Sequence, residues 1–193
     1  PTTDAPTPSK ATADVISIFS DAYTDVATNY NPFWNQSGSV NTTYDPTGGG
    51  TNNVLAYTNF DYQGTELTTQ NAAAMEYLHV DLWTSADPAN TDIQISPINN
   101  GTGAGEVLVS ITYTSGSWIS VDIAKSSFTG MTWDSVYQLK VAANATGSTV
   151  PVDIYLDNIY FWKAPLNTNT DATLSDLQVD NTTITGFSGA LTS

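Results

Sequence analysis

The sequence predicts an all-β domain, a β-sandwich of the jelly-roll type with about eight antiparallel strands. Charged residues make up only 12% of the chain, whereas helical proteins normally carry many more Glu, Lys and Arg. Several short segments alternate apolar and polar side chains with the period of two that a half-buried strand requires. Turns rich in Gly and Asn, such as TGGGTNN and INNGTGAG, separate these segments.

Eight segments carry the strand pattern, and a jelly roll has that number of strands. In chain order they are Val15–Phe19, Val54–Phe60, Met75–Thr84, Asp92–Pro97, Glu106–Thr114, Ser117–Ile123, Val136–Ala143 and Val152–Trp162. Helical signals are weak, because segments 68–74 and 126–134 are too short for an independent helix.

The last of these segments, VDIYLDNIYFW, contains a break in its alternation. Apolar side chains alternate regularly up to Leu156, and the pattern then continues in a shifted phase from Ile159. A shift of one residue turns the side chains to the opposite face of the sheet. We therefore expect a β-bulge near Asp157 and Asn158.

The chain divides into four parts by composition. Residues 1–13 are rich in Pro, Thr and Ala and predict an extended linker, and residues 14–163 form the main domain. Residues 164–171 predict a second linker. The run ATLSDLQVDNTTITGF in residues 172–193 resembles the opening of a cadherin-like module, and we interpret it as the truncated start of a second β-sandwich. Other modules of the same chain are therefore expected partners.

Charge and composition exclude several classes of partner. The net charge is −15, with four Lys and no Arg, so the clustered cations that nucleic acid requires are missing. The same charge disfavours anionic membranes and makes neutral polysaccharides better partners than anionic ones. No apolar run is long enough to span a membrane, and without Cys the chain has neither disulfides nor thiolate metal sites.

The segment MEYLHVDLWT predicts a binding surface. Leu78, Val80 and Leu82 face the core, and strand alternation then places Tyr77, His79, Asp81 and Trp83 together on the other face. Aromatic rings stack on the apolar C–H face of a pyranose, and polar side chains pair with its hydroxyl groups. The alternative is that the two aromatic side chains cover the edge of the core or a neighbouring loop.

The segment VYQLKVA adds two polar candidates. Gln138 and Lys140 share one face of this strand, and we expect that face to belong to the same concave sheet as His79 and Asp81. Together they would form a hydrogen-bonding floor. The alternative is an ordinary solvated outer face.

Two loops supply further candidates for sugar contacts. Trp34 lies in the polar run NPFWNQ, where an indole serves either as a wall for a ligand or as a plug over the core. The run DYQGTE is predicted to place Tyr62, Gln63 and Glu66 around a turn at Gly64, whose backbone a ligand can approach closely. The alternative for this run is a plain turn.

The sequence predicts that the chain is not an enzyme. It has three Glu, and none lies in the ExDxxE run of jelly-roll glucanases. Glycoside hydrolysis needs two carboxylates across a cleft, for which Asp81 with Glu66 or Asp61 forms only a formal pair. His79 is the single His, and no Gly-x-Ser-x-Gly motif accompanies it.

Several separated motifs resemble one family in the same order along the chain: ISIFSDAYTDV, NPFWNQ, YTNFDYQGTE, MEYLHVDLWT, WISVDI, VYQLKV and VDIYLDNIYFWK, which together span residues 16–163. They are similar to the jelly-roll carbohydrate-binding modules of marine Bacteroidetes polysaccharide-utilisation proteins.

This resemblance implies an extracellular or cell-surface module. Its expected activity is non-catalytic binding of a neutral β-1,3-glucan of the laminarin type on the concave sheet face. The alternatives are a structural spacer or adhesion sandwich and, with less support, a small glycanase or lyase.

The resemblance also implies a structural calcium ion. In modules of this kind the Asp of the closing strand helps to hold the ion, and Asp157 occupies that position here. Asp21 ends the first strand, which usually neighbours the last strand in a jelly roll. Calcium prefers several oxygen ligands in irregular backbone. Asp25 and Asp153 are alternative ligands.

Overall fold

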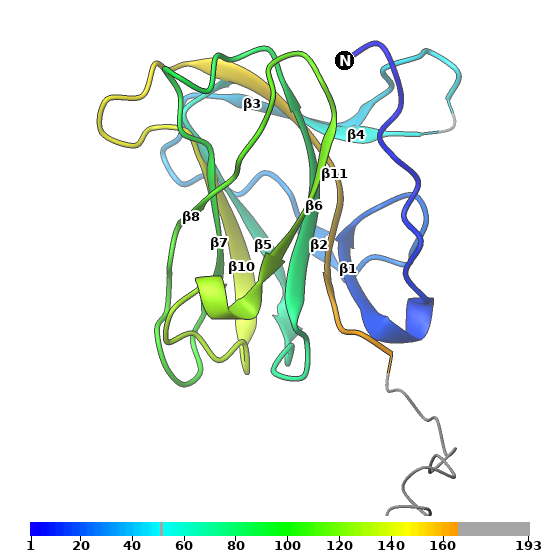
Figure 1. The fold of residues 1–193 in the computed structure, drawn as a ribbon, viewed down its shortest axis with the longest axis vertical. Helices are drawn as coiled ribbons and strands as arrows, with labels where there is room; N and C mark the ends of the chain where they lie inside the picture. Colours follow the sequence, from blue (N-terminus) through cyan, green and yellow to red (C-terminus); the bar gives the residue numbers. More distant parts are fainter. Residues whose placement is uncertain (51, 166–193) are drawn as a thin grey trace, which may run out of the picture.

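Two antiparallel sheets pack face to face in the computed structural model, which describes residues 1–50 and 52–165 (Figure 1). The prediction of an all-β sandwich is confirmed. The six-stranded sheet has the order β3 (Ser39–Tyr44), β4 (Val54–Phe60), β11 (Val152–Trp162), β6 (Tyr77–Thr84) and β9 (Ile119–Ala124), with β1 (Val15–Phe19) also paired to β11. The five-stranded sheet has the order β2 (Thr28–Asn29), β5 (Tyr62–Gln70), β10 (Val136–Ala142), β7 (Gln94–Asn99) and β8 (Val109–Ser110).

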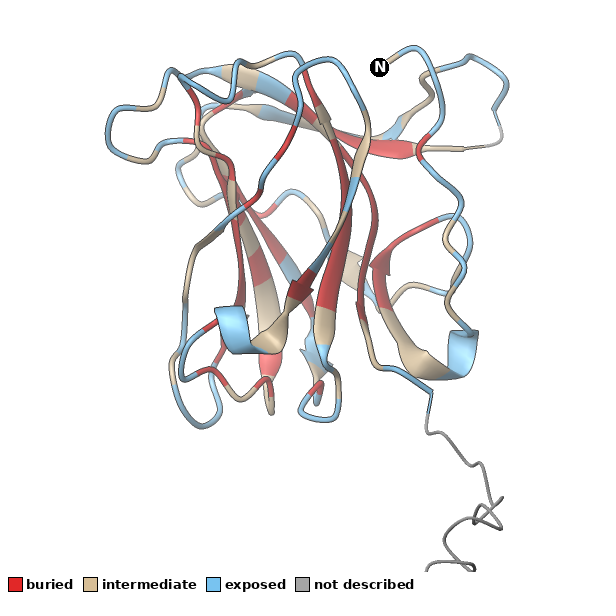
Figure 2. Ribbon diagram, in the orientation of Figure 1, coloured by how far each residue is buried: buried red, intermediate tan, exposed pale blue. Residues whose placement is uncertain are grey.

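The core lies between the two sheets and is built by strand alternation. Leu78, Val80 and Leu82 of β6 are fully buried, and Leu139 and Val141 of β10 are buried in the opposite sheet. Figure 2 shows that the buried residues are concentrated along the strands, while the loops at both ends of the sandwich are mainly exposed. The polar side chains between these apolar positions therefore lie on the two outer faces.

The sequence located most strands correctly. The predictions for Val15–Phe19, Val54–Phe60 and Val152–Trp162 coincide with β1, β4 and β11. The predicted strand Glu106–Thr114 is wrong in length, because only Val109–Ser110 pairs as β8.

Strands β2, β3 and β5 were not predicted, and β5 replaces the expected turn at Gly64. This glycine lies in mid-strand and pairs with Lys140 of β10. The inward positions of β5 include the polar residues Gln63 and Thr65, so the strand lacks the apolar alternation by which a half-buried strand is recognised. A glycine between polar residues has the same local signature in a turn and in such a strand.

The predicted bulge in the closing strand is confirmed. The register between β11 and β6 shifts between Asp157 and Tyr160, and Asn158 has a φ of 50°. On its other edge β11 pairs with β4 through Val152–Leu156 and with β1 through Ile159–Trp162. The bulge thus lies where one long strand changes its neighbour.

The side chain of Asn158 holds three other parts of the chain at the bulge. Its Nδ2 donates to Oδ2 of Asp81 at 2.7 Å and to the carbonyl oxygen of Pro6 at 2.8 Å, and its Oδ1 accepts from Ser20 Oγ at 2.7 Å. Asn158 is 3% exposed, so water cannot easily replace these bonds.

The N-terminal segment lies along the outer face of the six-stranded sheet (Figure 1). Trp118 Nε1 donates to the carbonyl oxygen of Thr3 at 2.9 Å, and Tyr23 Oη donates to that of Lys10 at 2.9 Å. The Lys10 ammonium lies 3.3 Å from the ring centroid of Trp162, which is cation–π geometry. The stretch predicted as a linker therefore contacts the domain.

The predicted division of the chain at residues 14, 164 and 172 stays a prediction. The cadherin-like run in 172–193 lies outside the described residues, as does all but the start of the predicted linker 164–171. Within the described ranges, no helix has the length and hydrophobicity needed to cross a membrane.

Replacing Asn158 tests the role of the bulge in holding the fold together. Asn158→Ala removes three buried hydrogen bonds and places a Cβ-bearing residue without a polar side chain at positive φ, so we expect a loss of about 2–4 kcal/mol in unfolding free energy. Asn158→Gly removes the same bonds but tolerates the backbone conformation, and it should lose about 1 kcal/mol less. Urea denaturation measures both, and wild-type midpoints in the two variants would contradict this role.

Candidate functional site

The outer face of the five-stranded sheet gathers polar side chains from neighbouring strands. Gln138 and Lys140 alternate with the buried side chains of β10 and therefore point outward. Register places Gln138 opposite Glu66, and Lys140 opposite Gly64. Glu106 joins them from the segment beyond β7, because its carboxylate lies 2.9 Å from the Lys140 ammonium.

An indole lies directly on this sheet. A Cβ added to Gly64 would come within 2.3 Å of the Trp34 ring, so the absence of a side chain at Gly64 makes room for it. Trp34 Nε1 donates to Oε1 of Glu66 at 3.3 Å, and Tyr62 Oη donates to the carbonyl oxygen of Trp34 at 2.6 Å. The ring remains half-buried, with part of its surface open to solvent.

We call the surface formed by Trp34, Tyr62, Glu66, Glu106, Gln138 and Lys140 the Trp34 face. It brings together five of the predicted sugar-binding residues, Trp34, Tyr62, Glu66, Gln138 and Lys140. Gln138 Nε2 lies 3.5 Å from Glu66 Oε1, so the polar groups on this face are close to one another.

Sequence reasoning missed two residues near this face. Phe33 is 82% exposed and directly precedes Trp34, so the residue next to the indole in sequence carries an open aromatic ring. Its signal was the pair of adjacent aromatic residues in the polar run NPFWNQ. Glu106 carried no such signal, because only the pairing of distant strands brings it to Lys140.

Gln63 does not belong to the Trp34 face. It is 2% exposed, faces the interior from β5, and donates from Nε2 to the carbonyl oxygen of Gly64 at 2.8 Å. The prediction that it surrounds a turn with Tyr62 and Glu66 is wrong because β5 is a strand, in which adjacent side chains point to opposite faces.

The other predicted row lies on the opposite side of the sandwich. Tyr77, His79, Asp81 and Trp83 share the outer face of β6, as alternation predicted, but β6 belongs to the six-stranded sheet. The expectation that Gln138 and Lys140 share a sheet with His79 and Asp81 is therefore wrong. Alternation determines which residues of a strand share a face, but long-range pairing determines the sheet to which the strand belongs.

His79 and Asp81 are enclosed rather than open to a ligand. They are 8% and 1% exposed, and the segment Pro6–Lys10 passes over them around a cavity of about 200 Å³. His79 Nδ1 lies 2.7 Å from Asp122 Oδ1, and its Nε2 lies 3.3 Å from Asp81 Oδ1. The imidazole also stacks on Tyr160 at a centroid distance of 4.5 Å.

The same segment covers the aromatic pair at the end of β6. Tyr77 stacks on Trp162 at 4.5 Å, and Lys10 covers Trp162. One face of the Tyr77 ring is thus already occupied by a side chain of the protein.

The charges around His79 favour its protonated form. Burial acts to lower the pKa of His79, but the hydrogen bonds and negative charges of Asp81 and Asp122 outweigh this effect and raise the pKa above its ordinary value.

Asp157 is a buried carboxylate, and the charged groups that act on it within the described residues are all carboxylates. It is 1% exposed, and its Oδ1 accepts from the backbone N–H of Asn158 at 2.7 Å. Burial, followed by the negative charges of Asp81, Asp21 and Asp25, raises the pKa of Asp157 to about 7. An oxygen ligand with these neighbours suits calcium chemically, because a divalent cation would compensate the clustered charge.

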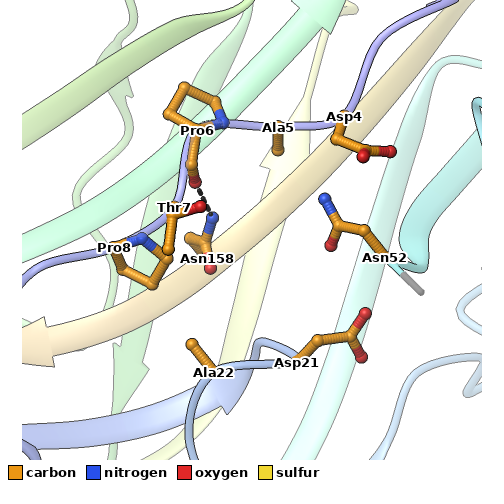
Figure 3. Close-up of a pocket in the computed structure, with 9 residues that line it drawn as sticks. All are labelled: Asp4, Ala5, Pro6, Thr7, Pro8, Asp21, Ala22, Asn52 and Asn158. Carbon is orange, nitrogen blue, oxygen red and sulfur yellow. Dashed lines mark hydrogen bonds between the residues drawn. The ribbon is translucent and has the colours of Figure 1, made fainter.

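The other expected calcium ligands have protein partners. Asp21 borders a cavity of about 310 Å³ with Asp4 and Asn52 (Figure 3), and its Oδ2 accepts from the backbone N–H of Asn53 at 2.6 Å. Asp25 accepts from Ser17 Oγ at 2.6 Å. Within residues 1–50 and 52–165, no group of three or more His, Asp or Glu side chains is arranged to hold a metal ion. Calcium stays a prediction.

No protein-family model matches the sequence, and no curated protein sequence matches it. Among solved structures, the chain is similar to a family 11 carbohydrate-binding module from Clostridium thermocellum in complex with a β-1,3-1,4-mixed-linked tetrasaccharide. The identity is 18%, the match covers 72% of this chain and 88% of that one, and the TM-score is 0.45.

A family 30 carbohydrate-binding module of a cellulosomal cellulase from the same organism is 16% identical. That match covers 76% of this chain and 96% of that one, with a TM-score of 0.47. An exo-β-agarase is 12% identical, over 72% of this chain and 24% of that one, with a TM-score of 0.47. With TM-scores below 0.5, these similarities assign no function to the chain.

Gly64→Ala tests the packing of the Trp34 indole against Gly64. The added methyl group must displace the Trp34 ring or the strand, and we expect a loss of about 1–3 kcal/mol in unfolding free energy together with a changed near-ultraviolet circular dichroism spectrum. In a Trp34→Ala background the same change should cost less than about 1 kcal/mol, because the clash is gone. Equal losses in both backgrounds would contradict the packing of Trp34 on Gly64.

The raised pKa of His79 predicts a pH-dependent contribution to stability. The contribution is fully present below the ordinary His pKa of about 6.5 and is lost as pH rises through the higher pKa of the folded state. The melting temperature should therefore fall more steeply between about pH 6 and 8 in the wild type than in His79→Gln. Circular dichroism melts measure the difference between the two proteins, and parallel pH profiles would show that His79 is not the responsible group.

Proposed function

We propose that the chain binds a neutral polysaccharide without catalysis, and that the sugar chain lies on the Trp34 face. The observation that carries the proposal is the half-buried indole seated on Gly64 and bordered by polar side chains of β5 and β10. A sugar ring has an apolar C–H face and a rim of hydroxyl groups, and this surface offers partners for both.

The polar groups on the face match the needs of hydroxyl groups. Glu66 accepts hydrogen bonds, Lys140 donates them, and Gln138 does both. All three lie on adjacent strands β5 and β10, which are spaced by about 4.8 Å. A sugar stacked on Trp34 would therefore find donors and acceptors on the sheet beside it.

The negative charge of the protein favours neutral polysaccharides as the proposed ligands. At a net charge of −15, and with one Lys on the Trp34 face, the protein repels polyanionic sugars. Within neutral chains we propose a β-1,3-glucan of the laminarin type, which rests on the family resemblance of the sequence motifs. The setting we propose is extracellular or at the cell surface, in a protein with further modules.

The non-catalytic part of the proposal rests on how the carboxylates are engaged. Glu66 accepts from Trp34 and lies beside Gln138, and Glu106 pairs with Lys140. Hydrolysis needs two carboxyl groups that face each other across a cleft, whereas each of these two is engaged by a neighbouring side chain. The formal pair of Asp81 with Glu66 is wrong, because these residues lie on opposite sheets.

Affinity gel electrophoresis against laminarin, mixed-linkage glucan, pustulan, xylan, mannan and alginate tests the proposal. We expect laminarin to retard the wild type and alginate not to. Trp34→Ala should weaken binding about tenfold or more, because stacking and buried area are both lost. Thr68→Ala, which changes an exposed side chain of β5 further along the strand, is the matched control and should bind as the wild type does.

Two outcomes of this experiment would contradict the proposal. Failure of every neutral glycan to retard the wild type would favour a spacer or adhesion role. Release of reducing ends from a retained glycan, lost in Glu66→Gln or Glu106→Gln, would show a glycanase.

We further propose that calcium binds at Asp157, with Asp21 contributing. The ion would supply the positive charge that this buried, negatively surrounded carboxylate lacks. Millimolar calcium should raise the melting temperature of the wild type by several degrees relative to EDTA, because a ligand that binds the folded state stabilises it. Asp157→Asn should not respond, whereas Asp153→Asn, at an exposed position of the same strand, should. An unchanged wild-type melting temperature would rule the site out.

A further inference from the structure

A second group of aromatic side chains lies on the outer face of the six-stranded sheet, away from His79 and Asp81, which the N-terminal segment covers. Tyr155 of β11 lies between Tyr44 of β3 and Trp83 of β6, with ring centroid distances of 4.9 Å and 5.5 Å. We call these three residues the Tyr155 row. It crosses the sheet from strand to strand, because Tyr155 is opposite Trp83 on one side and opposite Ala56 of β4 on the other.

The Tyr155 row is open, unlike the other aromatic group on the same sheet. Tyr160 is 1% exposed beneath the N-terminal segment, whereas Tyr44, Tyr155 and Trp83 are half-buried and keep part of their surface open. Core packing and the covering segment account for Tyr160. They do not account for three neighbouring rings that keep part of their surface in water, and a contact surface is one explanation for such a group.

A polar depression adjoins the row. It has a volume of about 550 Å³, within the range of about 300–1,000 Å³ typical of ligand sites, and it is lined by Thr58, Asn59, Ser85, Ala86, Pro151, Val152 and Asp153. Asp153 and Tyr155 are two residues apart on β11 and so share the outer face. Asp153 at the depression and Tyr155 in the row are therefore neighbours on that face.

The chemistry of this surface suits a neutral saccharide. The rings offer faces for sugar C–H groups, and the hydroxyl, amide and carboxylate groups of Thr58, Asn59 and Asp153 offer hydrogen-bond partners. The residues around the depression include one carboxylate and no cationic side chain, which disfavours sulfated or uronic sugars.

We propose that the Tyr155 row and its depression form a second, independent binding surface for a neutral oligosaccharide. The inference takes its ligand class from the proposed function but uses the opposite face of the sandwich. Two surfaces on opposite sheets would let one domain hold two glycan chains, and each weak contact would then strengthen the retention of the protein on a polymer.

Titration of the full chain with laminarin oligosaccharides, followed by the indole N–H signals in two-dimensional NMR, tests the inference. We expect the Trp83 signal to shift and saturate in Trp34→Ala as it does in the wild type. Tyr155→Ala should weaken the response of Trp83 about fivefold or more and leave that of Trp34 unchanged. Asp153→Ala, at an exposed position, serves the same purpose if Tyr155→Ala does not fold.

The outcomes separate this inference from the proposed function. A Trp83 signal that stays fixed while the Trp34 signal moves would overturn the second surface and leave the first intact. Movement of Trp83 alone would support the second surface and overturn the first, and no movement of either would overturn both. Shifts of Trp83 that follow protein concentration without sugar would show that a second copy of the chain occupies the row, and would overturn the inference.

Discussion

The arrangement of this sandwich depends on β11, which pairs with β6 on one edge and with both β4 and β1 on the other. The bulge at Asp157 and Asn158 lies between the residues that pair with β4 and those that pair with β1. The Asn158 side chain binds β6 through Asp81 and the N-terminal segment through Pro6. The break in alternation therefore connects the sheet, the first strand and the covering segment.

This covering segment gives the two outer faces different characters. On the six-stranded sheet it encloses His79 and Asp81, so these polar groups satisfy one another under cover. The outer face of the five-stranded sheet instead carries a half-buried indole and a set of partly open polar side chains. Only groups with remaining hydrogen-bonding capacity and accessible apolar surface can recognise a sugar, which is why the Trp34 face is a better candidate than the covered pair His79 and Asp81.

A strand could be predicted from the sequence when its buried and exposed positions carry apolar and polar side chains in turn. β6 and β11 alternate apolar and polar side chains clearly, so their positions, the bulge and the outward row of β6 could be predicted. The side chains of Gln63 and Thr65 in β5 point into the core, and Gly64 lies between them. The sequence of β5 therefore resembles that of a loop. Three features depend on long-range strand pairing, which a single sequence does not display. They are the packing of Trp34 on Gly64, the pairing of Glu106 with Lys140, and the placement of β6 and β10 in different sheets.

A crystal structure of the chain with a β-1,3-linked glucan oligosaccharide tests the central claim most directly. The account predicts a sugar ring stacked on Trp34, with hydroxyl groups bonded to Glu66, Gln138 or Lys140. Ordered sugar found only beyond the Trp34 face, at concentrations that saturate the protein in solution, would contradict it.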